Sequence, residues 1–160
     1  MTTSTNTITF GTDGWRAIIA QDYTFDNLAR VSHATATWLL NTAGPEPEIA
    51  LGHDTRFQGR AFSEYAASVF ASRGIRVHFS DDIAATPAVS YMTRELGCDA
   101  GIVITASHNP ATYNGFKIKG PYGGSALPAM IEAVEKEIPP VDHDYAEPAT
   151  FSEYVDSGAI

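Results

Sequence analysis

Cysteine and long apolar runs are both scarce in this sequence. Its 160 residues contain a single cysteine, Cys98, which cannot form a disulfide within the chain. A disulfide-stabilised secreted domain is therefore excluded, and we predict a cytoplasmic location. No run approaches the ~20 apolar residues that span a bilayer, and residues 1–9 lack the basic start and apolar stretch of a signal peptide. We accordingly expect no membrane partner.

Basic residues are also few. The chain has 10 lysines and arginines against 19 aspartates and glutamates, which gives a formal net charge of -9. Such a surface repels the phosphates of nucleic acids, so we expect no nucleic-acid partner. A small anion can still bind where a local cluster of donors overcomes the overall field. The 44% hydrophobic and 18% charged residues are typical of a globular chain, long enough for one domain.

Strand and helix patterns alternate along the chain. We expect an α/β fold, a three-layer α/β/α domain with helices over a mixed, mainly parallel sheet. Thr86 is expected to cap the third helix, with Pro87 in its first turn. The predicted helices cover 25–40, 60–72, 87–96 and 127–138, and the predicted strands cover 8–10, 15–19, 49–51, 76–80, 100–105 and 116–119.

The composition changes after Pro139-Pro140. Residues 141–160 are acidic, show no strong period and end without a closing element of their own. We therefore predict a domain over 1–140 and a connector over 141–160 that leads toward a second domain.

Thr105 to Lys119 is the segment with the strongest signs of chemistry. The apolar strand before it delivers the chain to a turn with short polar groups, among them Ser107 and Asn109. Ligand sites in α/β sheets lie at such strand ends. Asn114-Gly115 is expected to form a tight turn, where glycine lets the backbone approach a ligand closely.

Two of the three lysines in the chain follow this expected turn. In Phe116-Lys117-Ile118-Lys119, strand alternation places the two apolar side chains on one face and the two lysines on the other. Two ammonium groups beside a serine hydroxyl suit phosphoryl chemistry, because they offset the charge of a phosphate and can move a proton. The pattern therefore indicates a phosphoryl-transfer site.

Ser107 has two alternative interpretations. As a hydrolase nucleophile it would need His108 as its base, but adjacent residues on an extended segment point in opposite directions, and the Gly-x-Ser-x-Gly elbow is absent. We reject that interpretation. In the other, Ser107, His108 and Asn109 only shape a turn, which the Ser-His-Asn-Pro run taken alone does not decide against.

Two further segments carry polar residues beside a turn or a strand end. Phe10 to Arg16 holds two glycines three apart and then Arg16, which suggests a backbone nest with a bidentate phosphate ligand, although the same residues suit a plain turn. Gly52 to Arg56 lies just past a predicted strand, and there Asp54 and Arg56 are expected to pair with each other.

Together these segments resemble the α-D-phosphohexomutase family, which includes phosphoglucomutases and phosphomannomutases. Four pieces match in order: Phe10–Arg16, Gly52–Arg56, the helix start at Thr86-Pro87, and Thr105–Lys119, which reads TASHNPATYNGFKIK. The resemblance extends from Phe10 to about Ile138. It implies that this chain is the first of the family's four domains, the one that carries the active-site serine.

The resemblance also implies roles for the motif residues. Ser107, Lys117, Arg16 and His108 are expected to be catalytic. Ser107 carries a phosphoryl group that passes to one hydroxyl of a hexose monophosphate; the bisphosphate then turns round and returns its other phosphate. Lys117 matches a general acid/base and Arg16 an arginine beside the phosphoserine. Arg16, His108, Asn109 and Lys117 are expected to bind substrate or phosphate, and the phosphate on Ser107 to bind Mg²⁺.

Other motifs of the family do not occur in this chain. The metal loop Asp-Gly-Asp-x-Asp-Arg, the sugar-recognition loop and the second phosphate-binding loop are absent. The resemblance therefore implies one domain of a longer polypeptide, inactive by itself, whose partners are the remaining domains and a hexose phosphate, either glucose 1-phosphate/6-phosphate or the mannose equivalents. The other Mg²⁺ ligands are expected in the second domain.

Two alternatives stay open at this point. One is a stand-alone binding or regulatory module that kept the fold without catalysis. The other is the first domain of a phosphoglucosamine mutase.

Overall fold

A computed structural model describes residues 8–160, so the first seven residues of the predicted 1–140 domain lie outside the described residues. No helix in the described part of the chain is long and apolar enough to cross a membrane. The elements in chain order are β1 (Trp15–Ile18), α1 (Phe25–Thr42), β2 (Glu48–His53), α2 (Gly59–Ser72), β3 (Arg76–Phe79), α3 (Thr86–Glu95), β4 (Ala100–Ile104), β5 (Tyr113–Lys119), α4 (Pro128–Lys136) and α5 (Phe151–Ser157).

The strands form one mixed sheet in the order β1-β5-β4-β2-β3. The pairs β4–β2 and β2–β3 are parallel, whereas β1–β5 and β5–β4 are antiparallel, so β5 runs against the other strands. The predicted mixed, mainly parallel sheet is confirmed. His53 at the end of β2 lies opposite Ile104 at the end of β4, so the loops that leave these two strands start from the same edge.

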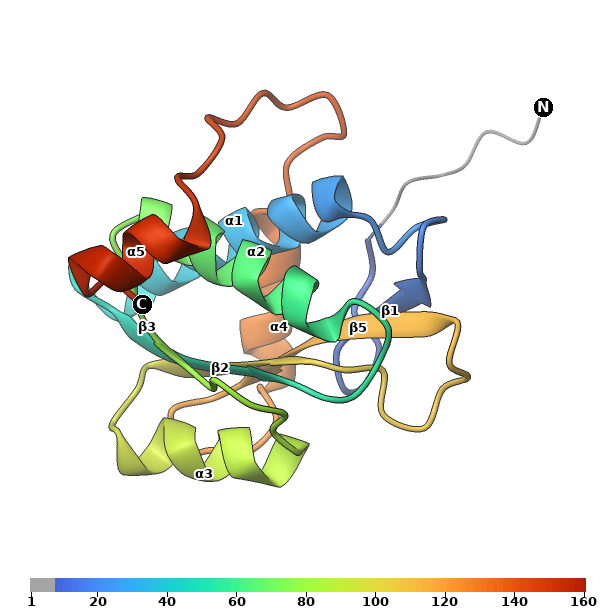
Figure 1. Ribbon diagram of the computed structural model, residues 1–160, viewed down its shortest axis with the longest axis horizontal. Helices are drawn as coiled ribbons and strands as arrows, with labels where there is room; N and C mark the ends of the chain where they lie inside the picture. The colour runs from blue at the N-terminus through green and yellow to red at the C-terminus, as the bar shows by residue number, and fades with distance from the viewer. Residues whose placement is uncertain (1–7) are drawn as a thin grey trace.

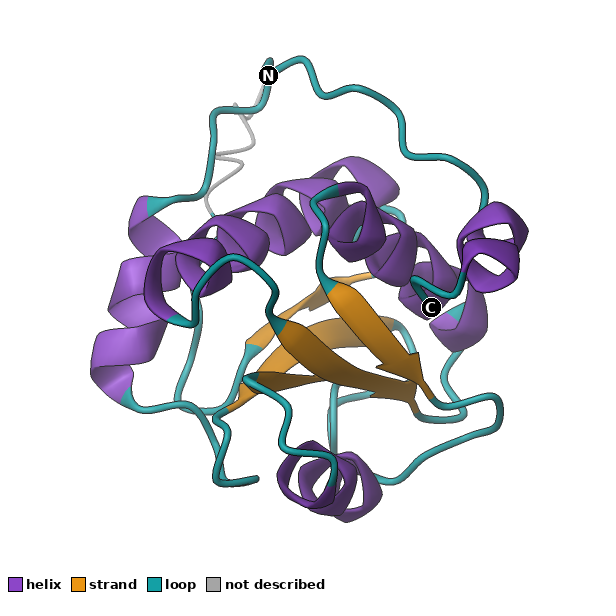
Figure 2. Cartoon of the chain, turned by 90° about the vertical axis from the view of Figure 1, so that its left-hand side faces the viewer, coloured by secondary structure: helices purple, strands orange, loops and turns teal. Residues whose placement is uncertain are grey.

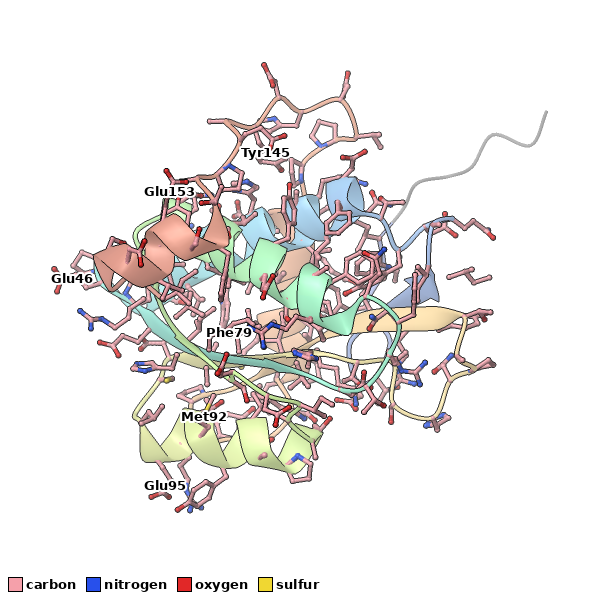
Figure 3. The ribbon with its side chains drawn as sticks, in the orientation of Figure 1. Glu46, Phe79, Met92, Glu95, Tyr145 and Glu153 are labelled. Atoms are coloured by element: carbon pink, nitrogen blue, oxygen red, sulfur yellow. The ribbon has the colours of Figure 1, made fainter. Side chains whose placement is uncertain are left out.

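Helices cover both faces of the sheet, which confirms the predicted three layers (Figures 1 and 2). The main core lies on the face covered by α1, α2 and α4, where Leu28 and Phe70 pack with Ile102. Among the described helices, α3 covers the other face, with Val89 packed near Val103. Figure 3 shows Met92 on the side of α3 toward the sheet and Glu95 on its outer side.

Three local predictions differ from the structure. Residues 8–10 do not form a strand. Helix α3 begins at Thr86 itself and Ala85 is its N-cap residue, so the predicted Thr86 cap is wrong by one position. Asn114-Gly115 is not a tight turn: both residues lie within β5, where Gly115 pairs with Arg16 of β1. A side chain at Gly115 would lie 2.5 Å from the Thr105 carbonyl oxygen, so glycine allows close approach of the neighbouring strands there.

Residues 141–160 contain a helix that periodicity does not reveal. Helix α5 begins with a capping box formed by Thr150 and Glu153. Phe151 contacts Phe79 of β3, with ring centroids 4.9 Å apart. The expected lack of a closing element is therefore wrong, while the boundary between a 1–140 domain and a 141–160 connector stays a prediction.

The segment between α4 and α5 passes over α1 (Figure 1). Within it, the Tyr145 ring stacks on His33 of α1, with centroids 3.9 Å apart and planes 1° from parallel. Burial, together with the charges of Arg73 and His143, lowers the pKa of His33 from 6.5 to about 4. His33 is therefore neutral at pH 7.

This depressed pKa predicts a loss of stability in mild acid. Between pH 6.5 and 4 the unfolded chain takes up a proton at His33 while the folded chain does not, so falling pH favours unfolding. From pH 7 to 4.5 the expected loss is about 2–3 kcal/mol. Urea unfolding of the wild type and of His33→Gln at both pH values measures it. The acid loss should be smaller in the variant by that amount; equal losses in both proteins would contradict the assignment.

Candidate functional site

The chain leaves β4 in a tight turn that displays Ser107. The Ser107 N–H donates to the Thr105 hydroxyl at 2.9 Å, and the Asn109 N–H donates to the Ala106 carbonyl at 3.0 Å. Ser107 has a φ of 56°, which is the left-handed region. Ser107 and His108 are exposed, whereas Ala106 is buried. The turn therefore presents the serine outward at the edge where β2 and β4 end.

The left-handed conformation at Ser107 predicts a measurable strain. A non-glycine residue there costs about 1–2 kcal/mol relative to the ordinary helical region. Ser107→Ala keeps that strain and Ser107→Gly removes it, so the glycine variant should be more stable than the alanine variant by about 1 kcal/mol. Chemical unfolding of the two variants measures the difference. An alanine variant as stable as the glycine variant would show that the loop relaxes.

Residues 11–14 form a second turn that lies directly on β5. The Gly11 N–H donates to the Gly14 carbonyl at 3.0 Å, so this N–H serves the turn rather than standing free in a phosphate nest. Gly14 has a φ of +100°, and a side chain there would lie 2.7 Å from the Phe116 carbonyl oxygen and 2.8 Å from Lys117 Cγ. Only glycine fits this close approach, which sets Asp13 over the lysines of β5.

Lys117 and Lys119 share one face of β5, and Phe116 and Ile118 lie on the other face in the main core, as the alternation predicted. Both lysines are buried, with exposed fractions of 3% and 5%. Lys117 Nζ forms an ion pair and hydrogen bond with the Asp13 carboxylate. Lys119 Nζ lies 3.9 Å from the second Asp13 oxygen and donates to the Ser125 hydroxyl at 3.3 Å.

The charges of this group perturb each other. Burial alone would raise the pKa of Asp13, but the hydrogen bond from Lys117, the charges of both lysines and the Ser125 hydroxyl together lower it below its usual range. Burial lowers the pKa of Lys119, Asp13 acts in the opposite direction, and Lys117 lowers it further. Asp13 is therefore ionised at neutral pH and holds the two ammonium groups together.

Arg16 joins this group to the serine loop, which is residues 105–112 between β4 and β5. Its Nη1 donates to Asn109 Oδ1 at 2.9 Å, and its Nη2 lies 3.9 Å from the Asp13 carboxylate. Arg16 Nε is buried and has no hydrogen-bond partner among the described residues. Three cations, Arg16, Lys117 and Lys119, thus surround one carboxylate, a local positive charge in a chain whose net charge is -9. Such a cluster attracts a small anion such as a phosphate group.

The structure brings three of the predicted site residues, Arg16, Asn109 and Lys117, into one connected set. Ser107 is two residues from Asn109 on the same turn. The His108 side chain is exposed, and its role stays a prediction. The sequence does not reveal Asp13 and Ser125 as site residues. The segment Phe10–Arg16 suggests a phosphate nest or a plain turn, and neither interpretation gives Asp13 a role. Its one available sign is its place between two glycines, which let the turn pack on the strand that carries the lysines.

Asp54 and Arg56 pair as expected, with Arg56 Nε 3.3 Å from Asp54 Oδ2. Arg56 also reaches the serine loop, which the sequence did not predict.

Metal ligands are sparse in this part of the fold. Within residues 8–160 no group of three or more His, Cys, Asp or Glu side chains could hold a metal ion. Asp13 is already engaged by the lysines. Of the predicted site, the exposed Ser107 would offer free oxygens, the ligands that Mg²⁺ prefers, if it carried a phosphate.

Known proteins with similar sequences include several that are named as sugar-phosphate mutases. The chain is 35% identical to a protein named probable phosphoribomutase of Schizosaccharomyces pombe over 86% of its length, 39% identical to a phosphoglucomutase of Staphylococcus saprophyticus over 76%, and 38% identical to a phosphoglucosamine mutase of Deinococcus radiodurans over 81%. It covers 25%, 22% and 28% of these proteins, respectively, so it spans about a quarter of the length of the curated relatives it matches.

A solved structure agrees with this likeness. The crystal structure of a Thermus thermophilus protein assigned as a phosphomannomutase superposes with a TM-score of 0.83 at 35% identity, over 90% of this chain and 32% of that one. The family model for the phosphoglucomutase/phosphomannomutase alpha/beta/alpha domain I matches residues 7–143, a span that includes the serine loop, the Asp13 turn and both lysines. The chain therefore belongs to the phosphoglucomutase/phosphomannomutase family, of which it is domain I.

Proposed function

We propose that this chain is the phosphoryl-carrying domain of a sugar-phosphate mutase, with Ser107 as the carrier. The observation that carries the proposal is the exposed serine on a turn whose Asn109 is bound by Arg16. Arg16 in turn lies 3.9 Å from the Asp13 carboxylate, which pairs with two buried lysines. A phosphoserine has a charge of about -1.5 to -2 at neutral pH. The excess of positive charge around Asp13 would stabilise that charge, and the family membership supports the same role.

The proposed reaction transfers one phosphoryl group and one proton in each half. A sugar hydroxyl gives its proton to solvent and its oxygen bonds to phosphorus, the bond between phosphorus and Ser107 Oγ breaks, and Oγ takes a proton from the Lys117 ammonium. In the second half, Oγ returns that proton to Lys117 and bonds to the other phosphorus of the sugar bisphosphate. The bond between that phosphorus and the sugar oxygen breaks, and this oxygen takes a proton from solvent. Arg16, Asn109 and His108 are proposed to bind the phosphate and the substrate.

Mg²⁺ is part of this proposal. Among residues 8–160, only the oxygens of a phosphorylated Ser107 would bind it. When bound, Mg²⁺ neutralises part of the charge of the transferring group. The remaining ligands and the sugar-binding groups are proposed to lie in further domains of the same polypeptide, so the 160 residues alone would not turn over substrate.

We propose glucose 1-phosphate/6-phosphate or the mannose equivalents as substrates. A second candidate is an amino sugar phosphate, because relatives with 38% and 40% identity are named phosphoglucosamine mutases. We also propose a cytoplasmic setting, because the single cysteine, Cys98, is a free and buried thiol and cannot form a disulfide within the chain.

The test is a substrate panel on the full-length protein that carries this domain. Turnover of the 1-phosphates of glucose, mannose, glucosamine and ribose is measured with Mg²⁺, and the intact mass shows whether one phosphoryl group is bound to Ser107. A preference for glucose or mannose phosphate supports the proposal, and a preference for glucosamine phosphate selects the second candidate. No turnover of any sugar and no phosphate on Ser107 would instead identify a non-catalytic module.

A further inference from the structure

Arg56 lies in the loop that leaves β2, and its guanidinium is directed into the serine loop that leaves β4. Nη1 donates to the carbonyls of Pro110 and Tyr113 at 2.8 and 2.9 Å. Nη2 donates to the carbonyls of Ser107 and Asn109, both at 2.8 Å. Both terminal nitrogens of Arg56 therefore donate to backbone carbonyls of the serine loop and of Tyr113, the first residue of β5, which lie 51 to 57 residues further along the chain.

The other side of Ser107 is held from the same β2 loop. Asp54 Oδ2 accepts a hydrogen bond of 2.5 Å from the Thr105 hydroxyl, and that hydroxyl in turn accepts the Ser107 N–H at 2.9 Å. Asp54 also accepts the Arg56 N–H at 3.0 Å. The peptide groups on both sides of Ser107 are thus fixed by two residues, Asp54 and Arg56, that themselves form an ion pair.

These contacts explain how Ser107 keeps its unfavourable backbone. A left-handed φ of 56° persists at a serine only where the surroundings over-determine it. The four backbone carbonyls that accept from Arg56 point their partly negative oxygens at its guanidinium. These oxygens are therefore directed away from a phosphate on Ser107 and do not repel it. We propose that Arg56 is a positioning residue for phosphoryl transfer, which holds the serine loop in the shape that presents Ser107; this inference rests on the proposed role of Ser107 as carrier.

The test compares Arg56→Lys and Arg56→Ala in the full-length protein, with kcat divided by the fraction folded under assay conditions. Lysine keeps the charge but has no planar fork, so it cannot hold four carbonyls at once. We expect normalised kcat to fall about 10²-fold in both variants, because a misplaced nucleophile loses rate rather than affinity, while KM stays within about twofold. Added guanidinium ion should raise the normalised kcat of Arg56→Ala at least about tenfold over its value without the ion.

Arg60→Ala is the matched control. Arg60 is on the first turn of α2, is about half exposed and pairs with Glu64 and Asp81, away from the serine loop. It should keep a normalised kcat within about twofold of the wild type. If Arg56→Ala does not fold, Arg56→Lys decides alone.

The positioning role would be overturned if the normalised kcat of Arg56→Lys equalled that of the wild type. It would also be overturned if the fall in measured activity were explained fully by unfolded protein. A Ser107→Ala variant run in parallel separates the two proposals. If Ser107→Ala retains turnover, the carrier role itself fails. If Ser107→Ala is inactive while Arg56→Lys is normal, only the inference about Arg56 fails.

Discussion

Ser107→Ala should abolish mutase turnover in the full-length protein that carries this domain. The proposed reaction passes every phosphoryl group through Ser107 Oγ, so removal of that oxygen removes the covalent intermediate and not merely a contact. We expect kcat to fall by at least about 10⁴-fold, the size of effect seen when a nucleophile is deleted. Steady-state assays with the preferred sugar phosphate measure it, and intact mass should show no phosphoryl group on the variant.

Ser72→Ala serves as the control for this experiment. Ser72 is exposed at the end of α2, and its hydroxyl donates to the Val69 carbonyl, so its removal should leave turnover unchanged. Substantial turnover in Ser107→Ala, or a phosphoryl group on another residue of that variant, would refute the carrier role. Because Ser107 is exposed and its backbone contacts remain in the alanine variant, a loss of activity would not be explained by unfolding.

Lys117→Met should produce the second largest effect, a fall in kcat of about 10²–10⁴-fold in the same protein. Methionine fills the space of the buried lysine but can neither donate a proton to Ser107 Oγ nor offset the phosphate charge. Asp13, whose side chain is 35% exposed, then keeps Lys119 and Ser125 as partners and can also reach water. The variant should therefore fold, and circular dichroism with kcat measurements on the same sample tests both statements.

Two further lysine variants make this result specific. Lys136 is the third lysine of the chain and lies exposed at the end of α4, so Lys136→Met should have wild-type activity. Lys117→Arg keeps the positive charge, but the guanidinium group does not release a proton. If Lys117 transfers a proton, the arginine variant should be about as slow as the methionine variant. Near-normal turnover in Lys117→Arg would show that charge alone is required.

The sequence predicted the serine loop and the faces of β5 well, because both depend on local information. A continuous apolar run followed by short polar residues indicates the end of a buried strand from neighbouring residues alone, and this pattern located the end of β4. Alternation over Phe116 to Lys119 separates the apolar and basic side chains regardless of what packs on them. The same locality caused the error at Asn114-Gly115, where a dipeptide with strong turn preference is held in β5 by pairing with β1.

Helix α5 shows a different limit of prediction from the sequence. It has seven residues, too few for a clear apolar period, and much of its packing comes from α2 and β3. The capping box of Thr150 and Glu153 was present in the sequence as a start signal, but a box without a following periodic run is weak evidence for a helix.

The sequence by itself determined the α/β architecture, the polar turn at Ser107 and the placement of two lysines on one face. The tertiary structure alone decided that these lysines are buried, that Asp13 holds them together and that Arg56 fixes the serine loop. Asp13 and Lys117 are 104 residues apart, and Arg56 is 51 residues from Ser107. Propensity and periodicity describe neighbours along the chain, whereas such pairs exist only after the sheet has brought β5 under the Asp13 turn and the ends of β2 and β4 side by side.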